Sequence, residues 1–285
     1  MALGWCIEWL QAFFLVADDM MDHSLTRRGQ PCWYKVPKVG LTACNDCIVL
    51  EACIYKILKK NAASLPCYVQ ARYSSPDLLL PPHAASQQLL ELFHDVTYQT
   101  SCGQLVDLIT APIGVVDLSK YTIETYMRIV TYKTAFYTFY LPAAIAMHLS
   151  GVTDAAAYAL AKDICIRLGQ FFQIQDDYLD CFGDPAVIGK VGTDIQDNKC
   201  GWLIVQALAR CSPAQREVFQ ENYGQDVPAK IAAVKAVYVE LGLEQVFLEY
   251  EESSFKELSA LISGQTLVPK ALFQDMLDKI YKRSK

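Results

Sequence analysis

The stretch LVADDMMD at residues 15–22 and the stretch FQIQDDYLD at residues 172–180 are the most informative about the structure of this 285-residue chain. Each contains the pattern Asp-Asp-x-x-Asp at the end of a long run of apolar residues with helical spacing. Side chains four residues apart lie on the same face of an α-helix. The two stretches therefore predict two long helices, each presenting a pair of carboxylates on one face.

These two Asp-rich clusters need a counter-charge. Asp18 and Asp22 share a face in the first cluster, and Asp176 and Asp180 share one in the second. Like charges at this spacing repel by roughly a few tenths of a kcal/mol when exposed, and burial costs far more. Carboxylates together with phosphate oxygens form the usual shell of Mg²⁺. The clusters therefore predict a site for Mg²⁺ and a diphosphate, and a solvated acidic face or a pair of helix caps is the alternative.

Basic residues accompany both clusters. Arg27 and Arg28 follow the first cluster, Lys190 and Lys199 follow the second, and Lys133 lies in an otherwise apolar helix. The guanidinium fork of arginine suits a diphosphate, whereas the lysine ammonium is a point charge. We expect Lys133 to be buried beside an anionic group, because its neighbours are apolar.

The rest of the chain is also typical of helices. Apolar residues recur with helical spacing, and Gly, Pro and Asn/Asp signals separate the runs. The sequence predicts an all-α single domain over residues 1–285, with a flexible insertion at about residues 68–88, where three prolines follow Pro66. The expected helices cover roughly residues 2–23, 40–60, 88–110, 119–149, 154–182, 198–210, 213–223, 227–241, 243–263 and 269–282.

Composition narrows the class of protein. Hydrophobic residues make up 53% of the chain, enough for a large core, and the net charge of −6 argues against nucleic acid as a partner. The apolar segment 135–152 carries polar residues and a proline, so we expect a buried helix there and no membrane span. Eleven scattered cysteines and no secretory leader indicate a reducing compartment. The chain begins directly in apolar helical sequence, which suggests that its beginning is missing.

Five motifs in order resemble the farnesyl diphosphate synthases, within the polyprenyl synthetase family. They are LVADDMMD at 15–22, LTRRG at 25–29, YKT at 132–134, FQIQDDYLD at 172–180 and GTDIQDNK at 192–199. The resemblance runs from Leu3 to Lys285, interrupted by the predicted insertion. It implies an isoprenoid-synthase-type helical bundle around a central active-site cavity, assembled as a homodimer in the cytoplasm.

The resemblance also implies a reaction. A Mg²⁺-dependent prenyltransferase of this family, with three ions per active site, condenses isopentenyl diphosphate with dimethylallyl diphosphate. It then adds a second isopentenyl unit to geranyl diphosphate, which gives farnesyl diphosphate and releases pyrophosphate for isoprenoid and sterol biosynthesis.

Residue roles follow from the same resemblance, position by position. The metal ligands and the residues that shape the metal site would be Asp18, Asp19, Asp22, Asp176 and Asp180. Substrate would be bound by Gln11, Arg27, Arg28, Lys133, Thr134, Gln173, Lys190 and Lys199. Within that set, Lys133, Thr134 and Gln173 would be catalytic, and Gln11 and Arg28 would face isopentenyl diphosphate. Phe13 and Phe14 would form the floor that limits the product to fifteen carbons.

Two departures from the family pattern leave alternatives open. The chain has no Gly-Lys-x-x-Arg segment, which in the family helps to bind isopentenyl diphosphate, and Ser284 stands where the family usually has another arginine. One hypothesis is an active synthase; the other is a non-catalytic relative that binds diphosphate or dimerises with a complete subunit. A terpene cyclase is less favoured, because cyclases usually carry an Asn/Ser/Glu metal motif in place of a second Asp-rich cluster.

Overall fold

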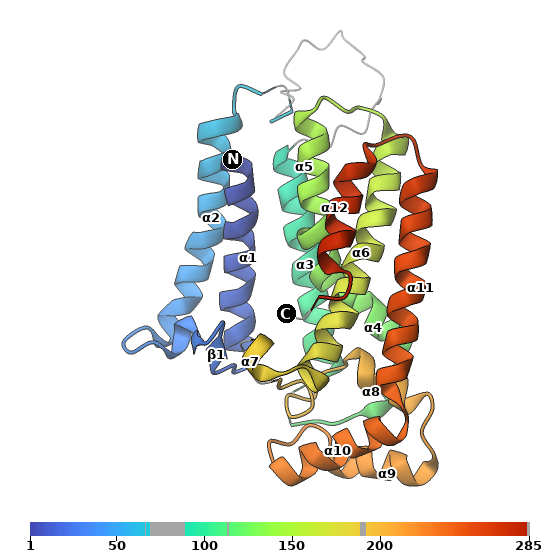
Figure 1. The fold of residues 1–285 in the computed structure, drawn as a ribbon. Helices are drawn as coiled ribbons and strands as arrows, with labels where there is room; N and C mark the ends of the chain where they lie inside the picture. The colour runs from blue at the N-terminus through green and yellow to red at the C-terminus, as the bar shows by residue number, and fades with distance from the viewer. Residues whose placement is uncertain (66, 69–88, 113, 189–191, 284–285) are drawn as a thin grey trace.

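The computed structural model of the chain describes residues 1–65, 67–68, 89–112, 114–188 and 192–283. The described residues are helical almost throughout, which confirms the all-α prediction (Figure 1). Most of the predicted insertion, residues 69–88, lies outside the described residues, as does Lys190. In the described part of the chain, no helix combines the length and apolarity needed to cross a bilayer.

The helices form a tall bundle with a smaller helical layer at one end (Figure 1). Helices α1 (Ala2–Met21) and α2 (Ala43–Ala62) run antiparallel at one side of it. The remaining long elements are α3 (Leu89–Thr110), α4 (Ile123–Val130), the π-helix η4 (Thr131–Tyr140), α5 (Leu141–Leu149), α6 (Ala155–Phe182), α11 (Leu243–Gly264) and α12 (Lys270–Ile280). The end layer holds α9 (Pro213–Asn222) and α10 (Pro228–Glu240), and α7 (Pro185–Ile188) and α8 (Trp202–Leu208) lie between it and the long helices.

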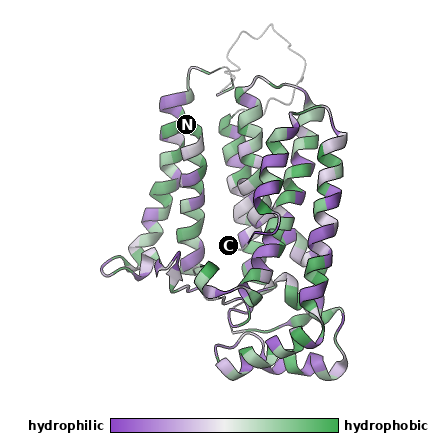
Figure 2. Ribbon diagram, viewed as in Figure 1, coloured by the Kyte–Doolittle hydropathy of each residue, from purple (hydrophilic) through white to green (hydrophobic). Residues whose placement is uncertain are grey.

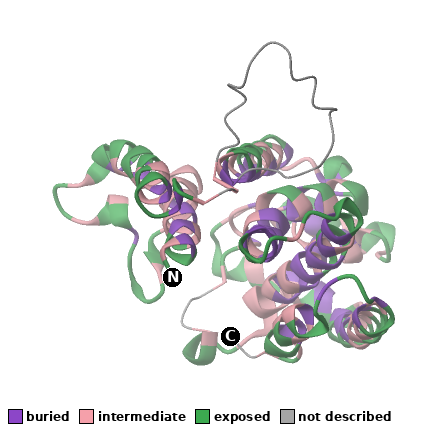
Figure 3. Ribbon diagram, turned by 90° about the horizontal axis from the view of Figure 1, so that it is seen from above, coloured by how far each residue is buried: buried purple, intermediate pink, exposed green. Residues whose placement is uncertain are grey.

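Two hydrophobic cores hold these helices together. The first joins α1, α2, α3, α5, α6 and α12 and includes the buried rings of Phe93, Phe171 and Phe273. The second joins α4, α8, α9, α10 and α11 and includes Phe219 and Tyr238. Apolar and polar residues alternate around the helices, and the buried residues line their inner faces (Figures 2 and 3). Burial of each large apolar side chain contributes about 1.5–3 kcal/mol to folding.

Local sequence fixes several helix starts. The side chain of Asp154 accepts a hydrogen bond from the N–H of Ala156 and so caps α6. Ser212 and Gln215 form a reciprocal capping box at the start of α9. The N-cap of α10 is Val227, which has no side-chain cap, and its first helical residue is Pro228.

The structure differs from the sequence prediction in two local elements. A short antiparallel hairpin pairs β1 (Thr26–Arg27) with β2 (Gln30–Pro31) directly after the first Asp-rich cluster. Two-residue strands are too short to show an alternating pattern, so they could not be predicted from the sequence. The helix expected over residues 119–149 is preceded by η3 (Leu118–Lys120) and consists of α4, η4 and α5. Its middle is a π-helix, which a 3.6-residue period does not predict.

Candidate active site

A buried network of ion pairs joins α1, α3, η4 and the segment after α7. Lys133 Nζ lies 2.7 Å from Asp107 Oδ2 and 3.1 Å from Asp18 Oδ1. Lys199 Nζ lies 2.6 Å from Asp22 Oδ2 and 3.3 Å from Asp107 Oδ2. The carboxylate of Asp107 therefore lies between two ammonium groups, and each ammonium also reaches one aspartate of the first cluster.

The electrostatics of this network are strongly coupled. Burial alone would raise the pKa of Asp107, but Lys133 and Lys199 lower it to about 2. Burial also opposes ionisation of Asp18, yet the same two lysines hold its pKa below the usual range. At Asp22 burial prevails and raises the pKa. The pKa of Lys133 is raised despite burial, because three aspartates surround it, so the ammonium stays charged.

Two glycines set the position of the π-helix that carries Lys133. A Cβ on Gly103 of α3 would lie 2.2 Å from the backbone N of Lys133, and one on Gly169 of α6 would lie 2.3 Å from the Cβ of Ala135. Only glycine permits helices to approach this closely. The π-helix therefore packs closely between α3 and α6, with the Lys133 side chain directed at Asp18 and Asp107.

Arginine and aspartate also pair at the end of α1. Arg27 donates from Nε to Asp19 Oδ1 at 2.8 Å and from Nη2 to the same oxygen at 2.6 Å, and it lies 3.5 Å from Asp18. Asp19 is buried, so this pair satisfies a carboxylate that would otherwise be costly. The next residue, Arg28, is exposed and occupies the hairpin turn with a positive φ of 53°, followed by Gly29 at 72°. Positive φ at both central residues is what a two-residue hairpin turn requires.

The second Asp-rich cluster ends α6 with three aspartates in different environments. The side chain of Asp176 is 38% exposed, and its Oδ1 lies 3.5 Å from Arg283 Nη2. Asp180 accepts hydrogen bonds from the N–H groups of Thr193 and Asp194, at 3.3 and 3.1 Å, and so anchors the loop that leads to Lys199. Asp177 is buried, and burial raises its pKa to about 7.

Asp177 ends a chain of hydrogen bonds that orients the predicted catalytic residues. The hydroxyl of Thr134 donates to Gln173 Oε1 at 3.0 Å, and Gln173 Nε2 donates to Asp177 Oδ1 at 3.0 Å. The other oxygen of Asp177 accepts from the N–H of Trp202 at 2.7 Å. Because Gln173 Nε2 donates to Asp177, the Oε1 end of the Gln173 amide faces Thr134.

Aromatic rings lie one turn before the first cluster. Phe13 and Phe14 have ring centroids 4.7 Å apart, and Phe14 lies 5.8 Å from the ring of Tyr137 in η4. Both phenylalanines pack partly buried against the first core. They form an apolar wall beside the helix turn that carries Asp18.

The structure thus brings together Asp18, Asp22, Lys133 and Lys199, which the sequence singled out. Gln11 lies half-buried on α1, two turns before Asp18. The sequence prediction missed two residues of α3, Asp107 and Gln104. Gln104 donates from Nε2 to Asp18 Oδ1 at 3.0 Å. A signal was available, since a glutamine and an aspartate three residues apart in a helix with buried apolar residues pose the same burial problem as Lys133.

A cleft of about 200 Å³ opens beside the network. Its walls include Asp22, Asp107 and Lys199 from the ion pairs and Gln196 and Asp197 from the segment after α7. The paired carboxylates are therefore within reach of a small polar ligand.

The donor set fits Mg²⁺ that is shared with a phosphate ligand. In the described ranges, no three His, Cys, Asp or Glu side chains come close enough together to hold a metal ion by themselves. Asp18 and Asp22 offer hard carboxylate oxygens on one face of α1, and Asp176 offers a partly exposed one on α6. Mg²⁺ in proteins typically takes one or two carboxylates and completes its shell with water and substrate phosphates.

Comparisons with known proteins agree with this geometry. The family model described as polyprenyl synthetase matches residues 1–241. The chain is 52% identical over 286 residues to the farnesyl pyrophosphate synthase of Gallus gallus, covering all of this chain and 73% of that protein. It is 53% identical to the farnesyl pyrophosphate synthase of Homo sapiens, covering 99% of this chain and 64% of that protein.

A solved structure gives the same result. Farnesyl diphosphate synthase of T. brucei complexed with minodronate superposes with a TM-score of 0.88 at 35% sequence identity, covering all of this chain and 77% of that one. These similarities favour a synthase over the non-catalytic alternative. The matched family model, the relatives more than 50% identical and the shared helical bundle show that the chain belongs to the polyprenyl synthetase family.

Proposed function

We propose that this chain is a Mg²⁺-dependent prenyltransferase that makes farnesyl diphosphate. It condenses isopentenyl diphosphate with dimethylallyl diphosphate, and then with the geranyl diphosphate formed, releasing pyrophosphate each time. The farnesyl pyrophosphate synthases of Gallus gallus and Homo sapiens support this activity, because they match essentially the whole chain.

One observation carries the proposal. Lys199 lies 177 positions from Asp22 in the sequence, yet its ammonium bonds to that carboxylate at 2.6 Å. The segment that follows the second Asp-rich cluster is thus folded against the first cluster. We propose that both clusters bind one diphosphate, the first through Asp18 and Asp22 and the second through Asp176 and Asp180.

The residues of the site suit ionisation of an allylic C–O bond. When bound, Mg²⁺ would neutralise the charge that develops on the departing pyrophosphate. Lys133 and Lys199 would stabilise the same charge, because the buried carboxylate of Asp107 already holds their ammonium groups in position. Arg27 and Lys190 would add to this positive field. The isopentenyl double bond then attacks the allylic cation, and the pyrophosphate takes the proton that is lost.

The oxygens of Thr134 and Gln173 would lie near the allylic cation. Their hydrogen bond fixes both side chains in one orientation, so their dipoles need not reorganise during the reaction. The rings of Phe13, Phe14 and Tyr137 would exclude water and limit the length of the chain. Arg28 and Gln11 would bind the isopentenyl diphosphate.

Assembly and location follow as further parts of the proposal. Exposed apolar residues on α3, namely Tyr98, Leu105 and Ile109, recur at helical spacing and favour a homodimer. All eleven cysteines are free thiols, which suits the reducing conditions of the cytoplasm.

The test is incorporation of labelled isopentenyl diphosphate with dimethylallyl diphosphate and Mg²⁺. We expect geranyl and farnesyl diphosphates from the wild type, and a loss of about 100-fold or more in Asp18→Asn and in Asp176→Asn. Asp163→Asn is the matched control, because Asp163 is an exposed aspartate on α6 paired only with Arg167 among the interactions shown. Diphosphate binding without any product would contradict the proposed activity.

A further inference from the structure

A buried carboxylate on α11 contacts the α6 face that leads to the second Asp-rich cluster. Glu251 is 4% exposed, and its Oε1 accepts a hydrogen bond of 2.8 Å from Gln175 Nε2. Gln175 is itself 1% exposed and immediately precedes Asp176. A carboxylate without a proton can only accept, so Glu251 fixes the Nε2 end of the Gln175 amide toward α11.

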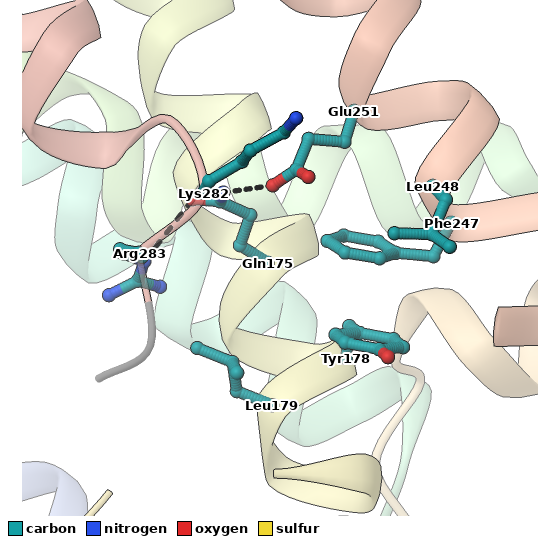
Figure 4. Close-up of a pocket in the computed structure, with 8 residues that line it drawn as sticks. All are labelled: Gln175, Tyr178, Leu179, Phe247, Leu248, Glu251, Lys282 and Arg283. Atoms are coloured by element: carbon teal, nitrogen blue, oxygen red, sulfur yellow. Dashed lines mark hydrogen bonds between the residues drawn. The ribbon is translucent and has the colours of Figure 1, made fainter. Parts of the chain in front are cut away.

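The other end of that amide faces the last residues of the described chain. Gln175 Oε1 accepts a hydrogen bond of 3.2 Å from Arg283 Nε (Figure 4). Arg283 also donates from Nη2 to the carbonyl of Phe172 at 3.0 Å, and its guanidinium lies 3.9 Å from the centroid of that ring. These contacts leave the Arg283 side chain only 12% exposed and place it 3.5 Å from Asp176.

We propose that Glu251 is a positioning residue that docks the C-terminal segment on α6 through Gln175. Glu251 selects the amide orientation in which an oxygen, and not an NH₂ group, meets Arg283. The docked Arg283 then holds a positive charge beside Asp176. The consequence for substrate rests on the proposed function, because Asp176 is proposed there to bind the metal–diphosphate complex.

The physical reason is that a glutamine amide has two orientations of nearly equal shape. With Glu251 present, only one orientation avoids placing two acceptors, or two donors, against each other. A glutamine at position 251 would accept from or donate to Gln175 equally well, so the flipped amide would become populated. The flipped amide presents a donor to Arg283, which has no acceptor, and the bond that holds Arg283 is lost.

Neighbouring contacts separate this role from general packing. Tyr281 and Lys282 reach the adjacent Glu252 instead, with the Tyr281 hydroxyl at 2.7 Å and the Lys282 ammonium at 3.1 Å. A pocket of about 250 Å³ is lined by Gln175, Glu251 and Arg283, with the stacked rings of Tyr178 and Phe247 on its far wall (Figure 4). Glu251 therefore reaches Arg283 through Gln175, whereas Glu252 contacts the two residues before it directly.

The experiment measures cleavage after Arg283 by an arginine-specific protease, read as loss of the last two residues in the intact mass. Docked Arg283 is protected, so we expect Glu251→Gln to be cleaved about 10-fold faster than the wild type. The control is Glu257→Gln, since Glu257 lies on the same helix and bonds to Ser253. It should be cleaved at the wild-type rate.

A double variant that exchanges the two residue types should restore the protection of Arg283. Glu251→Gln combined with Gln175→Glu again gives one carboxylate and one amide, now with the carboxylate facing Arg283. We expect this double variant to be protected like the wild type. If Glu251→Gln is cleaved at the wild-type rate, the inference is overturned. It is also overturned if the double variant is cleaved as fast as Glu251→Gln.

Steady-state kinetics test whether docking of Arg283 affects substrate binding. We expect Glu251→Gln to raise the KM for the allylic diphosphate more than it lowers kcat, because Arg283 lies beside Asp176. The double variant should restore the KM. Since proteolysis needs no substrate, a wild type without turnover would contradict the proposed function and leave the cleavage result to decide the role of Glu251.

Discussion

Asp107 shows how a single residue organises this site. Its carboxylate is buried between Lys133 and Lys199, and those lysines also reach Asp18 and Asp22. Removing one partner of a buried ion pair leaves the other charge without compensation, which costs about 3–5 kcal/mol. Asp107 therefore fixes the positions of two ammonium groups at once.

We predict that Asp107→Asn lowers the free energy of unfolding by about 3 kcal/mol at pH 7. The folded pKa of Asp107 is about 2, below the ordinary 3.8. Its contribution is complete above pH 3.8 and is lost as the pH falls toward 2, because the unfolded chain binds the proton first. The difference between variant and wild type should thus shrink by about 2 kcal/mol over that interval. Urea denaturation at several pH values checks this, and a difference independent of pH would contradict it.

Phe14 carries the prediction about product length. Its ring lies between Phe13 and Tyr137, one turn before Asp18, so Phe14→Ala should open space in the direction of a growing prenyl chain. We expect products longer than fifteen carbons, measured by chromatography of the dephosphorylated products. A profile that still ends at farnesyl would show that the floor lies elsewhere.

The sequence showed which residues belong to the site better than it showed which residues they contact. Lys133 does lie beside anionic groups, as its apolar neighbours indicated, but those groups are Asp18 and Asp107 of the chain itself. Residue types and spacing along one helix could not show that Asp107 of α3 meets both lysines. That contact depends on how three separate segments pack.

The π-helix is the element on which the site depends. Gly103 of α3 approaches its backbone so closely that a methyl group would lie 2.2 Å from the N atom of Lys133. We predict that Gly103→Ala displaces η4, destabilises the fold by about 2 kcal/mol or more and lowers kcat. Gly4→Ala is the control, because no side chain or other segment beyond its own stretch of helix lies within 4 Å of its Cβ position. Because Gly4 lies in the first turn of α1 and not in its interior, we expect this change to stabilise by less than about 0.5–1 kcal/mol, the value for a mid-helix glycine.

Thermal unfolding and steady-state kinetics of the two variants check the prediction. If Gly103→Ala is as stable and active as the wild type, the close approach does not position Lys133.

Long elements were predictable from the sequence, and short or irregular ones were not. The predicted helices at 154–182 and 243–263 correspond to α6 (Ala155–Phe182) and α11 (Leu243–Gly264), because the apolar spacing is clear in both and Asp154 caps the first. The π-helix and the β1–β2 hairpin escaped prediction. The first keeps an apolar composition while its hydrogen bonds change, and the second has too few residues to show a period.

The surface of the whole molecule bears on its assembly. Tyr98, Leu105 and Ile109 of α3 are 71%, 56% and 59% exposed. Their positions differ by seven and by four, so the three side chains lie on one face of the helix and form an apolar stripe. We predict a homodimer in solution and expect Leu105→Lys combined with Ile109→Lys to give monomers. Light scattering after gel filtration measures the mass. Leu267→Lys is the control, because Leu267 is 50% exposed between α11 and α12 and lies off the stripe.

A wild-type monomer, or a double variant that remains dimeric, would contradict this assignment of the stripe.

Across the whole bundle, we propose that α1 and α6 serve one diphosphate site. Calorimetry of inorganic pyrophosphate binding in Mg²⁺ tests it most directly, because no turnover is needed. We predict that Asp18→Asn and Asp176→Asn each abolish Mg²⁺-dependent binding, and that Asp163→Asn binds like the wild type. Wild-type affinity in either the Asp18 or the Asp176 variant would contradict a shared site.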